Sequence, residues 1–223
     1  MHVDRVVFKG RAARVRYAVE RFGRVMGGRV LDVGCDVATL RGLLPEADYV
    51  GVDIGGEPDV RLDLERTEAL PFADGSFDCV VCLDVLEHLD NLHRIFDELI
   101  RVSRRHVLVS LPNNWANARR PVGRGKGAIG HYGLPADPPA DRHKWFFGLS
   151  EGVGFLRERS RRAGASVVEL RAVEKPRPWP LRALRRLLCV SQRRYLNRYA
   201  HTLWAVLACA PGPGREGPPA APK

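Results

Sequence analysis

The sequence predicts an α/β fold, a doubly wound and mostly parallel sheet of seven strands whose last strand is antiparallel. Short apolar runs typical of buried strands alternate with segments of helical periodicity, which is the pattern of a parallel sheet covered on both faces. The chain of 223 residues is long enough for one domain with a substantial core. Its composition, 45% hydrophobic and 28% charged, is ordinary for a globular protein.

The first expected element is an amphipathic helix over residues 11–26, where Val15, Val19 and Phe22 recur at helical spacing before two glycines end it. Strands are expected at seven apolar runs: 29–33, 49–52, 60–62, 77–83, 106–111, 166–173 and 202–208. Between them, helices are expected to start at residue 39 and to cover 91–102 and 150–163.

From the composition we expect one domain, residues 1–210, followed by a tail. Within the domain, residues 112–148 are rich in Gly, Pro, Asn and His, and a loop this long is typically functional, here a lid or acceptor loop. Residues 177–199 are expected to form a basic helical insertion before the last strand. The tail, 211–223, is mostly Pro, Gly and Ala and is expected to be disordered.

No apolar run approaches the roughly 18–20 residues that a membrane span needs, and the first residues lack the apolar stretch of a signal peptide. We therefore expect a cytoplasmic protein. The basic insertion also allows a peripheral location at the inner membrane surface.

Two of the five cysteines, Cys79 and Cys82, have a spacing found in redox and zinc half-sites. No second pair completes a set of four ligands, and in a strand positions three apart face opposite sides. We expect buried structural thiols and predict no metal site.

A nucleotide site is expected where the first strand ends. Gly34 lets the backbone turn sharply and approach a ligand closely. The following helix presents free N–H groups at the carboxyl edge of the sheet. Asp53, nineteen residues further on, ends the second strand and can accept both ribose hydroxyl protons. These features are typical of a Rossmann-like fold.

Six short motifs then occur in order: VLDVGC (30–35), YVGVD (49–53), DLE (63–65), LPFADGSFDCVV (70–81), VLEHL (85–89) and SLPN (110–113). In this order and spacing they resemble the class I S-adenosylmethionine (SAM)-dependent methyltransferases. The resemblance implies SAM as cofactor, with the loop after the first strand on its methionine part and Asp53 on its ribose. Asp63, followed by Leu64, matches the acid that contacts the adenine edge.

The cofactor-binding residues that the resemblance implies are Asp32, Gly34, Cys35, Asp36, Asp53, Ile54, Asp63, Leu64, Leu83 and His88. The family usually has glycine where this chain has Asp36 and Ala38. Asp36 adds charge near the methionyl carboxylate, and it is placed either to face the ammonium group or to cap the next helix. The tRNA adenine-N1 methyltransferases have a similar Asp-x-Ala-x-Leu pattern in this loop.

Methyl transfer from a sulfonium is an in-line displacement, so positioning supplies much of the rate, and a hydroxyl acceptor needs a base that titrates near neutrality. His143 matches the family's His-x-x-aromatic stretch, which helps form the acceptor pocket, and is the predicted base, with Asp141 to orient it. His88 is either a wall of the active site or a locally packed residue at a helix start. The predicted substrate-binding residues are Asn113, Asn114, His131, Tyr132, Arg142 and Trp145. For the aromatic residues near 145, the alternative role is to fasten the lid to the core.

The net charge of +10 is concentrated at one end of the chain. Eight arginines, one lysine and one glutamate follow from residue 177 on, so the last 47 residues carry +8. Over 181–199 leucines alternate with arginines. Such a helix can lie on an anionic membrane or grip phosphates. The favoured interpretation is a helix with its leucines on the sheet and its arginines in water.

Three functions remain open. The first is a SAM-dependent methyltransferase that acts on a small molecule or on a glycan, which can be anionic or lipid-linked. The second is an RNA methyltransferase, favoured by the charge although no RNA-binding module is recognisable. The third is a non-catalytic SAM-binding accessory protein with a partner enzyme, because the stretch 101–113 also resembles the methionine-biosynthesis accessory proteins of this superfamily.

Overall fold

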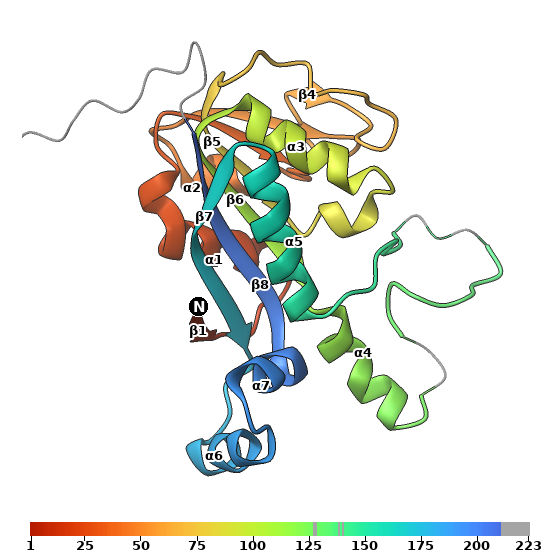
Figure 1. Ribbon diagram of the computed structural model, residues 1–223. Helices are drawn as coiled ribbons and strands as arrows, with labels where there is room; N and C mark the ends of the chain where they lie inside the picture. Colours follow the sequence, from red (N-terminus) through yellow and green to blue (C-terminus); the bar gives the residue numbers. More distant parts are fainter. Residues whose placement is uncertain (127–128, 138, 140, 211–223) are drawn as a thin grey trace, which may run out of the picture.

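The computed structural model describes residues 1–126, 129–137, 139 and 141–210, and its centre is one eight-stranded sheet (Figure 1). The strands are β1 His2–Arg5, β2 Arg29–Val33, β3 Asp48–Asp53, β4 Val60–Arg61, β5 Phe77–Leu83, β6 Ser103–Pro112, β7 Ala165–Glu174 and β8 Ala200–Cys209. Their order is β1-β7-β8-β6-β5-β2-β3-β4. Strand β8 runs antiparallel to β6 and β7, and the other pairs are parallel. The predicted mostly parallel sheet with an antiparallel last strand is confirmed.

The predicted number of seven strands is wrong by one, because β1 adds a parallel edge strand. Residues His2–Arg5 pair with residues 171–174 of β7. None of the four side chains of β1 is fully buried. This strand therefore lacks the apolar run by which the other strands were recognised.

Helices cover both faces of the sheet. They are α1 Arg11–Phe22, α2 Thr39–Leu43, α3 Leu92–Val102, α4 Asn114–Gly123, α5 Leu149–Arg162, α6 Trp179–Leu188 and α7 Gln192–Tyr199, with 3₁₀ turns at Gly23–Val25 and Leu86–His88. Side chains of α1 and α2 belong to one hydrophobic cluster, and those of α3, α5 and α7 belong to the other. Cys79 lies in the first cluster and Cys82 in the second, so both are buried as predicted, and all five cysteines are free thiols.

Helix α1 is fastened to the sheet by Trp204 of β8, which is fully buried. The Trp204 ring stacks on Phe22 with centroids 5.7 Å apart and meets Tyr17 edge-on at 5.1 Å. Aromatic pairs in these arrangements add stability beyond their buried area. These contacts fix the second half of α1 against the sheet. The first turn of the helix then lies at the carboxyl edge of the sheet.

Part of the predicted 112–148 loop is helical. Helix α4 begins after Asn113, whose side-chain oxygen accepts a hydrogen bond from the backbone N–H of Ala116 at 3.3 Å. Asparagine is among the preferred N-cap residues for this reason. Residues 127, 128, 138 and 140 of the segment, and the predicted tail 211–223, lie outside the described residues.

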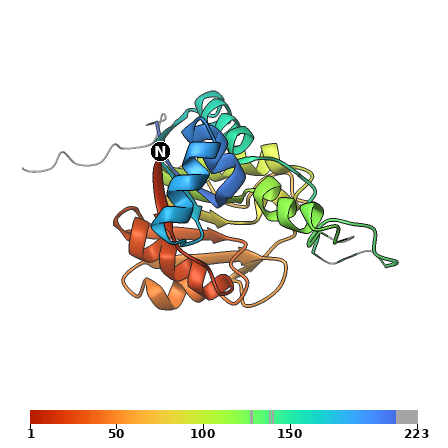
Figure 2. The same ribbon diagram turned by 90° about the horizontal axis from the view of Figure 1, so that it is seen from below.

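The basic insertion between β7 and β8 consists of two helices, α6 and α7, rather than one. Figure 1 places them beyond the end of β7 and β8, and Figure 2, viewed from that end, shows them in front of the sheet. The expectation that leucines cover the sheet holds for Leu196 of α7, which is buried. It is wrong for α6, which has no buried residue. No helix in the described part of the chain is long and apolar enough to cross a bilayer.

Candidate active site

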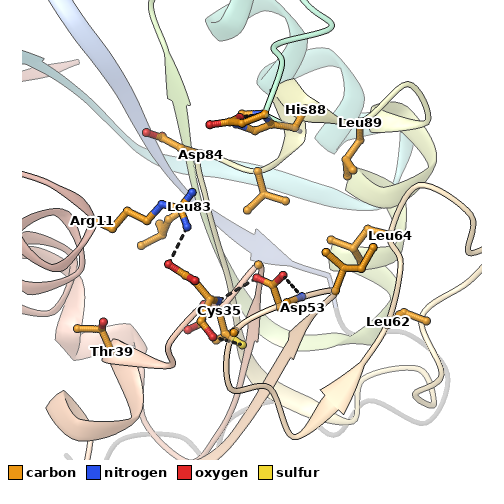
Figure 3. Close-up of a pocket in the computed structure, with 18 of the residues that line it drawn as sticks. Arg11, Cys35, Thr39, Asp53, Leu62, Leu64, Leu83, Asp84, His88 and Leu89 are labelled. Atoms are coloured by element: carbon orange, nitrogen blue, oxygen red, sulfur yellow. Dashed lines mark hydrogen bonds and ion pairs between the residues drawn. The ribbon is translucent and has the colours of Figure 1, made fainter. Parts of the chain in front are cut away.

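A pocket of about 360 Å³ opens at the carboxyl ends of β2, β3 and β5 (Figure 3). Open α/β sheets bind their ligands at this edge. All ten residues assigned to cofactor binding line it: Asp32, Gly34, Cys35, Asp36, Asp53, Ile54, Asp63, Leu64, Leu83 and His88. Arg11 and Arg14 of α1 also line the pocket, and neither was predicted.

Gly34 makes the sharp turn after β2. Its φ is 80°, and a Cβ at this position would lie 2.2 Å from Cγ2 of Val85. The N–H groups of Gly34 and Cys35 both donate to the carbonyl of Val52, at 2.8 and 3.2 Å. Only glycine fits here, so bare backbone forms this wall of the pocket.

The two positions where this chain departs from glycine are strained. Asp36 and Ala38 have φ values of 51° and 50°, in the left-handed region that glycine adopts without cost. The Asp36 carboxylate pairs with the Arg11 guanidinium at 2.6 Å. The capping role considered for Asp36 is wrong, because α2 begins after Ala38 and has no side-chain cap. Instead, the Arg11 pair offsets the charge that Asp36 brings to the pocket.

Asp53 is held at the tip of β3 by backbone donors. Its Oδ2 accepts the N–H of Asp36 at 2.8 Å, and its Oδ1 accepts the N–H of Gly55 at 3.0 Å. A carboxylate offers about four acceptor positions, so two bonds fix its orientation and leave capacity for a pair of hydroxyl donors. The predicted ribose contact therefore has a suitable geometry.

Asp32 lies deeper, 7% exposed, and accepts a hydrogen bond from the Tyr49 hydroxyl at 2.9 Å. Burial raises the pKa of Asp32 to about 7, although the Tyr49 bond acts in the opposite direction. Burial also raises the pKa of the Cys35 thiol to about 12. This thiol is therefore protonated at neutral pH and unsuited to act as a nucleophile.

The far end of the pocket combines apolar walls with one acid. Leu62, Leu64 and Leu89 line it, and Asp63 lies beside them. The Oδ1 of Asp63 accepts the backbone N–H of Glu65 at 2.9 Å. An apolar slot with a carboxylate at its edge suits a flat base with an exocyclic amine.

Three histidines gather beside the pocket. The rings of His131 and His143 stack with centroids 4.5 Å apart, and His88 meets His143 edge-on at 4.6 Å. The carboxylate of Asp141 lies 3.0 Å from Nδ1 of His88 and 3.4 Å from Nδ1 of His131. His88 thus forms a wall of the pocket, and Asp141 orients His88 and His131 rather than His143.

His143 is held by two other polar groups. Its Nδ1 lies 3.2 Å from the Tyr132 hydroxyl and 3.3 Å from Oδ1 of Asn114. Burial, together with the neighbouring His88 and His131, lowers the pKa of His143 to about 4. The ring is therefore neutral at pH 7 and is a weaker base than a free imidazole, so the expectation that the predicted base titrates near neutrality is wrong.

Asn113 does not line the pocket, and neither does its neighbour Asn114, which contacts His143 in the histidine cluster beside it. Asn113 is fully buried, and its amide donates to the carbonyls of Asn197 at 2.9 Å and Ala200 at 2.8 Å. These bonds join α4 to the junction of α7 and β8. Asn113 is therefore a structural residue and does not face an acceptor.

Three further residues predicted to bind the acceptor, Tyr132, Arg142 and Trp145, make hydrogen bonds within the lid or between the lid and the core. Tyr132 donates its hydroxyl to the carbonyl of Trp145 at 2.9 Å, and the Trp145 indole donates to the carbonyl of Leu89 at 2.7 Å. Arg142 contributes its backbone carbonyl, 3.2 Å from Nδ1 of His88. Trp145 thus fastens the lid to the core, the alternative considered for the aromatic residues.

Glu87, the buried residue directly before His88, is a further residue that was not predicted from the sequence. It is 1% exposed, and its Oε2 has no hydrogen-bond partner among the described residues. Burial, with Asp84 nearby, raises the pKa of the Glu87 carboxyl. The sequence signal that could have identified Glu87 is its position directly before His88, because His88 was already assigned to the pocket.

Comparison with known protein families gives one match over most of the chain. The family, described as "Methyltransferase domain", matches residues 8–202. A ubiquinone biosynthesis O-methyltransferase from Shewanella pealeana is 31% identical over 97 residues, 35% of this chain and 40% of that protein. A protein of the same name from Cronobacter sakazakii is 28% identical over 123 residues, 47% and 51% of the two chains. The chain thus spans about half, or less, of the length of these curated relatives.

Solved structures show the same fold. The magnesium protoporphyrin IX methyltransferase from Synechocystis, determined with bound SAH, has a TM-score of 0.51 at 18% identity. The match covers 89% of this chain and 81% of that one. At this identity the likeness concerns the fold alone.

Proposed function

The chain belongs to the methyltransferase domain family, and from this premise we propose that it transfers the methyl group of SAM to an oxygen of a small-molecule acceptor. The observation that carries the proposal is the pocket itself, where all ten residues assigned to the cofactor from sequence come together. A glycan acceptor remains the second form of the same activity. Either acceptor is modified by in-line displacement, so the main task of the protein is positioning.

The residues present fit SAM. The bare backbone at Gly34, where a side chain has no room, suits close approach of the methionine part. Asp53 has acceptor capacity for the two ribose hydroxyls, and Asp63 lies in an apolar slot for the adenine. When bound, SAM supplies an electrophilic methyl group on a sulfonium.

An oxygen acceptor is favoured by two observations. The curated relatives that match part of this chain are named O-methyltransferases. The lid also holds the uncharged imidazole of His143 beside the pocket, where it contacts Tyr132 and Asn114. In the proposed arrangement His88 and His143 face the acceptor hydroxyl, and His143 assists its deprotonation.

The proposal is tested by calorimetric titration of the full chain with SAM. Asp53→Ala should weaken SAM binding by about tenfold or more, since hydrogen bonds to a charged group contribute about 1.5–3 kcal/mol each. The matched control is Asp48→Ala, at the opposite end of β3, where the carboxylate pairs with Arg29 on the surface. Wild-type affinity in Asp53→Ala would refute the ribose assignment.

The two alternative functions give different results. Tight, salt-sensitive binding of RNA would favour an RNA methyltransferase. Thermal stabilisation by SAM without turnover of any acceptor, with a partner enzyme that copurifies, would favour an accessory protein.

A further inference from the structure

We propose that Glu87, His88 and His143 form a binding site for one divalent metal ion at the edge of the cofactor pocket. One candidate ligand atom from each residue lies within 4.8 Å of the other two. The three residues come from two segments far apart in the sequence, the turn after β5 and the lid. Two imidazoles and one carboxylate are a donor set that Zn²⁺ and similar borderline cations prefer.

The Glu87 carboxylate is the strongest single argument. It is 99% out of solvent, and its Oε2 has no hydrogen-bond partner among the described residues. Its Oε1 lies 3.8 Å from Nε2 of His88. Burial of a carboxylate oxygen without a partner is costly, and buried carboxylates are normally paired or coordinate metals. A cation between these atoms would supply the missing partner.

The two histidines are arranged as metal ligands usually are. Nδ1 of His88 is held by the Asp141 carboxylate at 3.0 Å and by the Arg142 carbonyl at 3.2 Å. Nδ1 of His143 is held by Tyr132 and Asn114. Metal-bound histidines almost always have one ring nitrogen fixed in this way by a carboxylate, carbonyl or other polar group. In both rings Nε2 remains for the cation.

The role of the ion rests on the proposed function, whereas its binding does not. His88 lines the cofactor pocket, so an ion held there has an open side toward the acceptor. A divalent cation lowers the pKa of a bound hydroxyl and fixes its position. With the ion in place, His143 holds the metal and no longer acts as the free base proposed for the metal-free site, and the acidified hydroxyl releases its proton to water.

Metal binding is tested on the full chain, stripped of metal and free of a histidine tag. Titration with Co²⁺, followed by its visible absorption, and calorimetry with Zn²⁺ should each give one equivalent. His143→Ala and Glu87→Gln should each weaken binding by at least about tenfold, since even loss of an outer partner typically costs 10–100-fold. His106→Ala, in β6 and outside the cluster, is the matched control.

Two results would overturn the metal site. One is the absence of stoichiometric binding by the wild type, and the other is unchanged affinity in both variants. Thermal melting of metal-free Glu87→Gln checks the fold, and the melting temperature should be close to that of the wild type, because the amide has nearly the same size as the buried carboxyl group. The same samples are titrated with SAM. If SAM binds but the metal ion does not, the metal site is refuted and the cofactor proposal is not affected.

The exposed face of α6 independently carries a second inference. Apolar side chains of α6 and the turn after it are largely exposed: Trp179 73%, Leu184 53%, Leu187 80%, Leu188 71% and Val190 84%. Three of them, at positions 184, 187 and 188, recur at helical spacing and so share one face. Exposed apolar side chains gathered in this way mark an interaction surface.

The charge around this face selects the partner. Residues 175–210 contain seven arginines and one lysine and no acidic residue. We infer that α6 lies on an anionic lipid surface, with its leucines in the headgroup region and its arginines on the phosphates. This would bring the pocket to acceptors dissolved in or attached to a membrane.

Cosedimentation with phosphatidylcholine vesicles, with and without phosphatidylglycerol, tests this inference. The full chain should bind only the anionic vesicles, and the double variant Leu187→Ser/Leu188→Ser should bind at least about tenfold more weakly, since each buried leucine contributes about 1.5–3 kcal/mol. The control is Val168→Ser in β7, where the side chain is 58% exposed. The inference is overturned if the wild type does not sediment with the anionic vesicles. It is also overturned if the α6 face has another partner, which would be seen if the double variant converts a dimer of this chain to monomers or loses bound RNA.

Discussion

The two sides of the pocket are built differently. On the cofactor side, the loops after β2 and β3 are short, and backbone groups hold the key carboxylate, as in the bonds from Asp36 and Gly55 to Asp53. On the acceptor side, the histidine cluster depends on side chains from a lid more than 50 residues away in sequence, as in the contact between His88 and the carboxylate of Asp141. Local motifs therefore specify the first side, whereas long-range packing specifies the second. Changes to the first should affect cofactor binding, and changes to the second should affect turnover.

The largest expected effect is at Gly34. In Gly34→Ala the new methyl group meets Val85 at a φ of 80°, so we expect a loss of about 3 kcal/mol in stability together with loss of SAM binding. Urea unfolding and calorimetry measure the two effects. Gly42→Ala in α2, where a Cβ meets no atom within 4 Å, is the control and should be neutral or slightly stabilising. Equal behaviour of the two variants would contradict the account of this turn.

Asp32 should make stability depend on pH. Its pKa is about 7 in the folded protein and close to 3.8 when unfolded, so the folded state binds more protons between these values. Stability therefore falls as pH rises from about 4 to about 7, by up to a few kcal/mol at about 1.4 kcal/mol per pKa unit. Asp32→Asn should remove this fall. The free energy of unfolding of both proteins is measured from about pH 4 to about pH 7. If the two plots against pH run parallel, the pKa of Asp32 is not raised in the folded protein.

Tyr132→Phe probes the acceptor side. The variant loses the hydroxyl that contacts His143 and the Trp145 carbonyl, so turnover should fall by about tenfold, the equivalent of about 1.4 kcal/mol. The affinity for SAM should stay unchanged, because Tyr132 does not line the cofactor pocket. A fall in SAM affinity equal to the fall in turnover would remove the distinction between the two sides.

The smallest expected effect is a gain. Ala38→Gly relieves a φ of 50° and should stabilise the protein by about 1 kcal/mol. Ala163→Gly, at the end of α5 with a φ of −86°, is the matched control and should not stabilise. Thermal unfolding of both variants gives the comparison, and a loss of stability in Ala38→Gly would mean that the Ala38 methyl packs better than its backbone conformation suggests.

The sequence predicted the sheet well, and the ten residues that it assigned to the cofactor gather at one pocket, because apolar runs and turn glycines are local signals. It missed β1, whose half-exposed residues carry no apolar pattern. It also placed Asn113 at the acceptor, although the partners that bury its amide lie 84 and 87 residues away. Glu87 was not predicted as a site residue, because the sequence around it does not show that a carboxylate in a turn is buried with an oxygen that lacks a partner in the described part of the chain. The leucines of α6 were placed on the sheet because amphipathic periodicity identifies an apolar face without showing what covers it.

The first helix is also tied to the pocket wall by two ion pairs, Arg11 with Asp36 at 2.6 Å and Arg14 with Asp84 at 3.0 Å. One pair lies on the loop after β2 and the other directly after β5, so α1 connects two loops that line the pocket. Ion pairs at a solvent boundary weaken as salt is added. The rates at which cofactor enters and its product leaves should therefore rise with ionic strength, even where the equilibrium affinity changes little.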